Sequence, residues 1–210
     1  MSRPKVLFVT GEPERCIERA RQTQALARQL GARRFEAESM GTQAGVCLAL
    51  GQREEALHLI RSAIDLSRAT GMTYCGPVLL GVLARATTDD AERETALAEA
   101  EQLLAGGCVS HSYFDFYTGA IDASLQQQRW GEARRYAAAL AQYTAEEPTP
   151  WTDAVVRRGI ALARIGEEGP SRSSAAELKS LRELFARMSA KPMIDALDAA
   201  IARCEQAAVA

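Results

Sequence analysis

The sequence predicts an all-α protein, an α-solenoid of about ten or eleven helices in antiparallel hairpins with a period of about 37–40 residues. Three observations predict it. Alanine is abundant while valine, isoleucine and threonine are sparse, which favours helices over sheets. Apolar residues recur at the i, i+3, i+4, i+7 spacing of an amphipathic helix. Two similar blocks, 11–31 and 51–71, begin 40 residues apart.

The bulk composition excludes several classes of function. With 25 basic and 27 acidic residues, the net charge is −2, which gives no basic patch for nucleic acid or an anionic membrane surface. No uncharged run is long enough to span a bilayer, and no signal peptide is recognisable. The five cysteines are odd in number and scattered, as expected of reduced thiols in a cytoplasmic protein.

Residues 1–10 are predicted to be irregular. The run from Val6 to Val9 reads either as a short buried strand or as the end of a helix whose beginning is missing. Extrapolating the period backwards makes residues 11–31 the second helix of a hairpin whose first helix is truncated, with Pro4 interrupting what remains. The chain is therefore expected to be a C-terminal piece or a degenerate relative of a longer protein. Its apolar remnant favours homodimerisation through this edge.

The two repeated blocks each begin and end with glycine, which supplies a turn and a helix C-cap. In the second block Ala56, Ile60 and Ala63 mark the apolar face, and residues 33–50 form the preceding helix. A third unit covers 73–104, where Pro77 suits the first turn of a helix and residues 88–90 offer a cap for the next.

The fourth unit, residues 107–153, holds eight of the chain's twelve aromatic residues. Ser110 or Ser112 is predicted to cap a helix with an apolar face of Phe114, Tyr117, Ile121 and Leu125, and Gly131 opens its partner. Two prolines then end the helix. A fifth unit follows at 151–165 and 173–188, separated by a linker-like segment at 166–174, and a last helix over 193–207 caps the array. The predicted division is 1–10, 11–166 and 167–210.

The pattern on both sides of Gly51 resembles a tetratricopeptide repeat. Its close-packing positions are occupied by the small residues Ala44, Ala56 and Ala63. Residues 11–163, most specifically the segments SHSYFDFY and YTAEEPTPW, are similar to a bacterial helical-repeat region. That region lies at the C-terminus of multidomain regulators that carry an adenylate/guanylate cyclase domain and a P-loop ATPase domain. The resemblance implies a tetratricopeptide-like right-handed superhelix and a role in bacterial signal transduction. The catalytic motifs of that family do not occur in this sequence, so the resemblance implies no enzyme.

Residues with catalytic or metal-binding chemistry are few and scattered. His111 and Asp115 share a helix face, but no further ligand for a metal is close to them in sequence. The carboxylate pairs fall at predicted helix ends, where they complement helix dipoles. No nucleophile and base are suitably spaced. We therefore predict no enzymatic activity, no metal and no cofactor.

The aromatic cluster and neighbouring arginines carry the functional prediction. Some aromatics of the fourth unit do not fit one core face, and Tyr, Trp and Arg are common anchors of partner binding. We predict a non-catalytic module that binds a protein partner, or other domains of a regulator, in the superhelix groove. The alternative is a small-molecule sensor with an aromatic pocket. The candidate contacts are Tyr113, Phe116, Tyr117, Tyr143, Trp151, Arg134 and Arg157.

Overall fold

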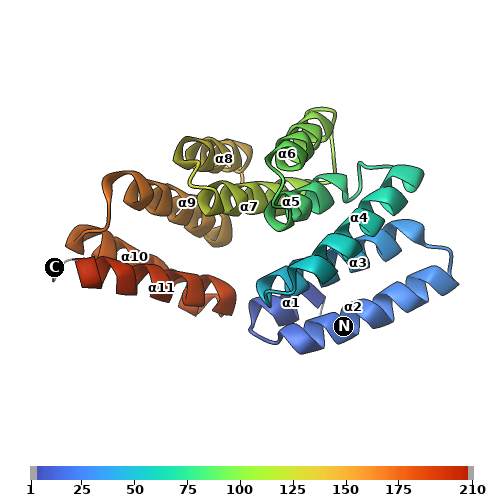
Figure 1. Ribbon diagram of the computed structural model, residues 1–210, viewed down its shortest axis with the longest axis horizontal. Coiled ribbons are helices and arrows are strands. Elements are labelled where there is room, and N and C mark those ends of the chain that lie inside the picture. Colours follow the sequence, from blue (N-terminus) through green and yellow to red (C-terminus); the bar gives the residue numbers. More distant parts are fainter. Residues whose placement is uncertain (1–3, 208–210) are drawn as a thin grey trace. The chain divides into compact units, whose positions relative to one another are not determined.

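The computed structural model describes residues 4–207, which form eleven α-helices and no strand (Figure 1). The all-α prediction is confirmed. The helices are α1 (Pro4–Val9), α2 (Pro13–Gln29), α3 (Arg33–Ala49), α4 (Arg53–Thr70), α5 (Gly76–Ala86), α6 (Asp90–Ala105), α7 (Ser110–Gln126), α8 (Trp130–Tyr143), α9 (Pro150–Glu168), α10 (Arg172–Arg187) and α11 (Lys191–Ala207).

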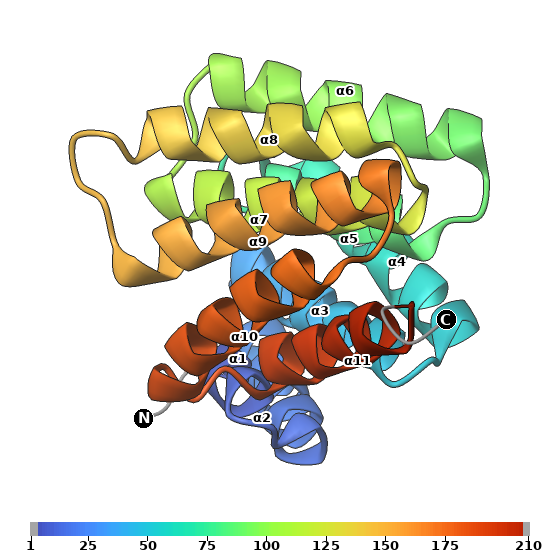
Figure 2. The same ribbon diagram turned by 90° about the vertical axis from the view of Figure 1, so that its left-hand side faces the viewer.

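The chain divides into two compact units, and α7 belongs partly to each. The first contains the residues up to Phe8 and Glu12–Ala120, and the second contains Val9–Gly11 and the residues from Ile121 onwards. Within the first unit, α2 packs against α3, α3 against α4, α4 against α5 and α5 against α6, and α3 also packs against α5. Within the second, α9 packs against both α8 and α10, and α10 and α11 lie side by side (Figure 2).

Residues 4–9 form a helix, so of the two readings offered by the sequence the strand is wrong. Pro4 was expected to interrupt this segment, but it is the first residue of the helix, where a missing N–H costs nothing. Leu7 packs with buried Cys16 and Val46 in one apolar cluster. The short helix therefore covers part of α2 and α3, as a first helix of a hairpin would.

The helix boundaries follow local signals in the sequence. Gly31 and Gly51 adopt positive φ values of 66° and 79° after α2 and α3, as predicted for helix-ending glycines. The side chain of Asp89 accepts hydrogen bonds from the first backbone N–H groups of α6, which confirms the predicted cap. The segment 166–174 is not a linker. Only residues 169–171 lie outside helices, because Gly169 ends α9 and Ser171 caps α10.

Helices approach closely where the repeat places small residues. Ala56, which the sequence assigns to the hairpin core, is fully buried, and Ala96 and Ala133 are buried at the equivalent positions of the next repeats. Four glycines on α3, α5, α7 and α9 follow one another at intervals of 40, 38 and 40 residues: Gly41, Gly81, Gly119 and Gly159. A Cβ atom on Gly41 would lie 2.3 Å from Leu79 Cδ2, so the glycine makes room for the neighbouring helix.

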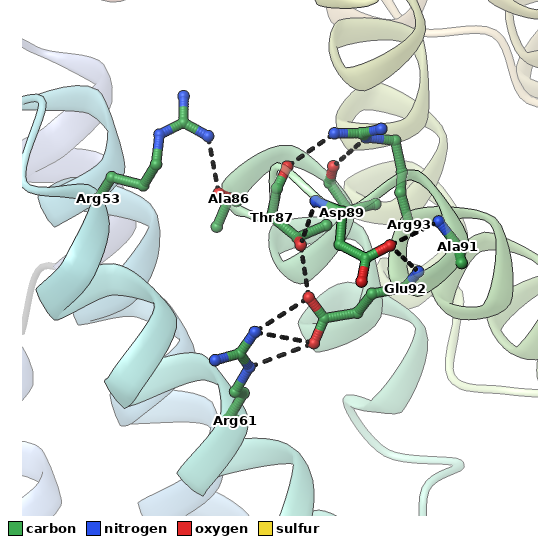
Figure 3. Close-up of polar contacts among 9 residues, drawn as sticks. Arg53, Arg61, Ala86, Thr87, Asp89, Ala91, Glu92 and Arg93 are labelled. Atoms are coloured by element: carbon green, nitrogen blue, oxygen red, sulfur yellow. Dashed lines mark hydrogen bonds and ion pairs between the residues drawn. The ribbon is translucent and has the colours of Figure 1, made fainter.

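The end of α5 is held by arginines from two other helices (Figure 3). Thr87 is extended, so the last carbonyl groups of α5 lack helical N–H partners. Arg93, only 2% exposed, donates to the carbonyl oxygens of Ala84 at 3.1 Å and Thr87 at 2.7 Å. Arg53 donates to the Ala86 oxygen at 2.7 Å. The guanidinium groups thus complete the hydrogen bonding of the turn between α5 and α6.

An ion pair in the same network connects α4 to α6. Arg61 donates to both carboxylate oxygens of Glu92 at 3.0 Å, and the Thr87 hydroxyl also donates to this carboxylate. The hydrogen bonds from Arg61 and Thr87 lower the pKa of Glu92 below its usual value. Glu92 therefore favours the folded state in its ionised form.

We expect this pair to make stability depend on pH in the acid range. Since the folded-state pKa is depressed, the stabilisation is fully present above about pH 4.3, the ordinary value of Glu, and is lost as pH falls through the folded-state pKa. Urea unfolding of wild type and Glu92→Gln should differ by about 0.5–1 kcal/mol at neutral pH and converge in acid. Glu54→Gln, on the exposed first turn of α4, is the control. A gap between wild type and Glu92→Gln that stays constant down to acid pH would contradict the assignment.

No helix within residues 4–207 combines the length and apolar character needed to cross a membrane.

Candidate functional site

Three aromatic rings from separate segments meet at a partly exposed surface of the first unit. The ring of Tyr74, just before α5, contacts Phe35 of α3 and His111 of α7 edge-on, with centroids 5.5 Å apart in both pairs. The guanidinium carbon of Arg34 lies 4.9 Å from the Phe35 centroid and 5.2 Å from that of Tyr74. These residues and Glu38 are here called the Tyr74 cluster. Edge-on ring pairs and cation–π contacts hold them in fixed relative positions.

The repeat explains why these residues meet. Arg34, Tyr74 and His111 follow one another at intervals of 40 and 37 residues, which is the period of the helix hairpins. Arg34 and His111 lie in the first turns of α3 and α7, and Tyr74 lies two residues before α5. Equivalent positions of successive hairpins become neighbours when hairpins stack. Sequence reasoning missed this cluster because it aligned only the second helix of each hairpin.

The hydroxyl group and the carbonyl oxygen of Tyr74 both form hydrogen bonds within the unit. Its hydroxyl donates to Glu38 Oε2 at 3.1 Å, and its carbonyl oxygen accepts from the Ser112 hydroxyl at 3.1 Å. Burial raises the pKa of Tyr74 to about 12, and the negative charge and hydrogen bond of Glu38 act in the same direction. The positive charge of Arg34 opposes them. The phenol is therefore neutral at physiological pH and acts as a donor.

The raised pKa of Tyr74 can be measured by titrating the absorbance of tyrosinate. The difference titration between wild type and Tyr74→Phe is expected to have its midpoint well above the ordinary tyrosine pKa of about 10. Because the folded-state pKa is raised, the associated stability is present below about pH 10 and is lost as pH rises toward 12. Glu38→Gln should lower the midpoint, whereas Arg34→Gln should raise it. A midpoint near 10 in the wild type would contradict the burial of the phenol, and a midpoint that Glu38→Gln leaves unchanged would contradict its contact with Glu38.

The first three predicted contact residues lie on α7 and belong to the first unit. Phe116 is fully buried, so its ring is part of the core of this unit, and a partner contact by it stays a prediction. Its ring lies beside Gly81, and a Cβ atom on that glycine would be 3.5 Å from the Phe116 Cδ2 atom, an ordinary contact distance. The Tyr113 hydroxyl donates to the Leu104 carbonyl at 2.7 Å, and the half-buried Tyr117 ring lies against Phe116. Partner contacts by the two tyrosines stay predictions.

The other four predicted residues belong to the second unit. Tyr143 is 39% exposed, and Trp151 packs edge-on against buried Phe185 with centroids 5.8 Å apart. Arg134 forms an ion pair with Glu167, and Arg157 forms one with Asp153 at 3.4 Å. Both arginines already have carboxylate partners, which weakens their case as receptors for an acidic ligand. The roles of all four as contacts stay predictions.

The chemistry available around the Tyr74 cluster is that of binding. Asp115, one turn beyond His111, forms an ion pair with Lys5 at 2.5 Å. Buried His111 Nε2 has no hydrogen-bond partner in the part of the chain that the structure describes. Across residues 4–207, no group of three or more His, Cys, Asp and Glu side chains is arranged to hold a metal ion. Cations, carboxylates and rings alternate over one partly exposed surface, which suits contacts with another molecule.

Comparison with known proteins adds no family. No family model matches the chain, and no curated protein matches it at a significant level.

Proposed function

We propose that this protein is a non-catalytic interaction module that binds a protein partner through the Tyr74 cluster. The observation that carries the proposal is the meeting of Arg34, Phe35, Tyr74 and His111 on a partly exposed surface of mixed charge. Aromatic rings and arginines with limited conformational freedom are the residues that contribute most to partner binding. An open surface of this kind favours a macromolecular partner over a small ligand, which requires enclosure.

The proposal includes the architecture expected from the sequence. The hairpins would stack as a tetratricopeptide-like right-handed superhelix, and the module would serve signal transduction in the bacterial cytoplasm, either in trans or coupled to other domains of a regulator. The supporting observations are the spacing of the four close-packing glycines and of the Tyr74 cluster, which both follow the 37–40-residue period. Repeat stacking creates extended surfaces suited to partner binding.

The test compares partners captured from the source cell's lysate by three forms of the protein. Phe35→Ala removes a ring that is 39% exposed and is expected to leave the fold intact. Arg33→Ala, two residues earlier at an exposed position, is the control. Circular dichroism first establishes that all three are folded. A protein bound by wild type and Arg33→Ala but lost by Phe35→Ala supports the proposal. Identical captures by all three contradict it.

A further inference from the structure

Arg34 is an exposed cation with a restrained position and no counter-ion. Its guanidinium carbon lies about equally far from two rings, at 4.9 Å from Phe35 and 5.2 Å from Tyr74. Stacking over aromatic rings uses the face of the planar guanidinium and leaves its in-plane N–H donors available. Within residues 4–207, no carboxylate lies within ion-pair distance of Arg34. The group is therefore positioned before any ligand arrives.

The carboxylate of Glu38 does not form an ion pair with Arg34. It accepts a hydrogen bond from the Tyr74 hydroxyl at 3.1 Å, and within residues 4–207 no ion pair joins it to Arg34. The other acidic side chain beside the cluster, Asp115, is paired with Lys5. The two acids of the surface thus have partners, whereas the arginine held by the rings has none.

A second ring-stacked arginine in the same molecule shows how such a group binds a carboxylate. The guanidinium carbon of Arg135 lies 4.1 Å from the centroid of the Tyr136 ring, and its Nε donates to Glu132 Oε2 at 2.8 Å. Arg135 therefore uses its face for the ring and its edge for an acid. Arg34 also lies near rings, at 4.9 and 5.2 Å from two centroids, and within residues 4–207 it has no ion-pair partner.

We infer that Arg34, held over Phe35 and Tyr74, is the receptor for an aspartate or glutamate side chain of the protein partner. The inference rests on the proposed function and specifies the partner chemistry, an acidic segment with an apolar or aromatic residue beside the acid. The acid would form two hydrogen bonds with the guanidinium edge, and the apolar neighbour would cover the exposed part of the Phe35 ring.

The experiment uses three acetylated and amidated peptides with the sequences Gly-Glu-Phe-Glu-Gly, Gly-Gln-Phe-Gln-Gly and Gly-Lys-Phe-Lys-Gly. Each is titrated into the full chain while the Arg34 side-chain Nε–H resonance is followed by nuclear magnetic resonance. The Glu peptide should bind about fivefold more tightly than the Gln peptide, the factor that one exposed ion pair supplies. The difference should shrink when salt is raised from about 0.05 M to about 0.5 M.

Two variants test whether the preference for the Glu peptide comes from Arg34 itself or from general electrostatic attraction to the protein. Arg34→Gln should abolish the preference for the Glu peptide. Arg33→Gln makes the same change of charge one residue earlier and should keep that preference. In both variants, peptide binding is followed by the resonances of the Tyr74 ring. Equal binding of the Glu and Gln peptides, or preference for the Lys peptide, would overturn the inference. Loss of the Glu preference in both variants, or no binding by any peptide, would also overturn it. The capture experiment with Phe35→Ala tests the proposed function separately, so the two failures can be distinguished.

Discussion

Replacing Arg93 with methionine is expected to lower the free energy of unfolding by about 3 kcal/mol. Methionine preserves much of the apolar contact of the side chain but leaves the Ala84 and Thr87 carbonyl oxygens without their donors. Each buried acceptor that loses its partner costs about 1–3 kcal/mol. Urea unfolding followed by far-ultraviolet circular dichroism measures the change.

Two further variants define the cause of the Arg93 effect. Arg93→Lys retains the charge and can reach one carbonyl oxygen, so it should restore part of the lost stability. Arg21→Met removes an exposed arginine of α2 and should cost less than about 0.5 kcal/mol. If Arg93→Met is as stable as Arg21→Met, the carbonyl groups at the end of α5 do not depend on the guanidinium.

Replacing Gly159 with leucine is expected to destabilise the second unit by about 2–3 kcal/mol. A Cβ atom at this buried position of α9 would lie 2.9 Å from Ile121 Cγ2 and 3.6 Å from Ala137 Cβ. Overpacking of this kind typically costs about 1–3 kcal/mol, more than leucine recovers through its higher helix propensity. Both tryptophans, Trp130 and Trp151, lie in this unit, so their fluorescence reports its unfolding in urea.

The control for Gly159 is a glycine with free space around it. Gly131 lies in the first turn of α8, and a Cβ atom there would meet nothing within 4 Å. Gly131→Leu should therefore leave the fluorescence transition unchanged or move it to higher urea, because leucine favours a helix more than glycine does. Equal loss in the two variants would show that close approach of helices at Gly159 is not the determining factor.

The fourth repeat shows where prediction of the core reached its limit. Residues 113–117 contain four aromatics, so several rotations of the helix about its axis present a ring to the core. The predicted face placed Phe114 and Tyr117 inwards, whereas the structure buries Phe116 completely and leaves the other two half-buried. In the structure the Phe116 ring lies beside Gly81 of α5, a residue of another helix. That pairing is not encoded within the helix itself.

The candidate site was missed for a related reason. Local aromatic density drew attention to residues 107–153, yet the Tyr74 cluster takes three residues from α3 and one each from two other segments. Its signal in the sequence is spacing: Arg34, Tyr74 and His111 are separated by the period of the hairpins. Extending the repeat alignment to the first helix of every hairpin would have brought them together.

Local sequence signals were sufficient to predict the helical class, the period, most helix ends and the small residues at the hairpin contacts. These depend on hydrogen bonds and side-chain periodicity within one or two helical turns, which neighbouring residues specify. Packing between helices made Phe116 part of the core, buried Arg93 with hydrogen bonds to two carbonyl oxygens, and brought Arg34 near two rings with no ion-pair partner within residues 4–207. Burial and pairing depend on the space and the polar groups that adjacent helices leave. The partners of Arg93 lie six and nine positions away in the sequence, and the Tyr74 ring lies 40 positions from Arg34.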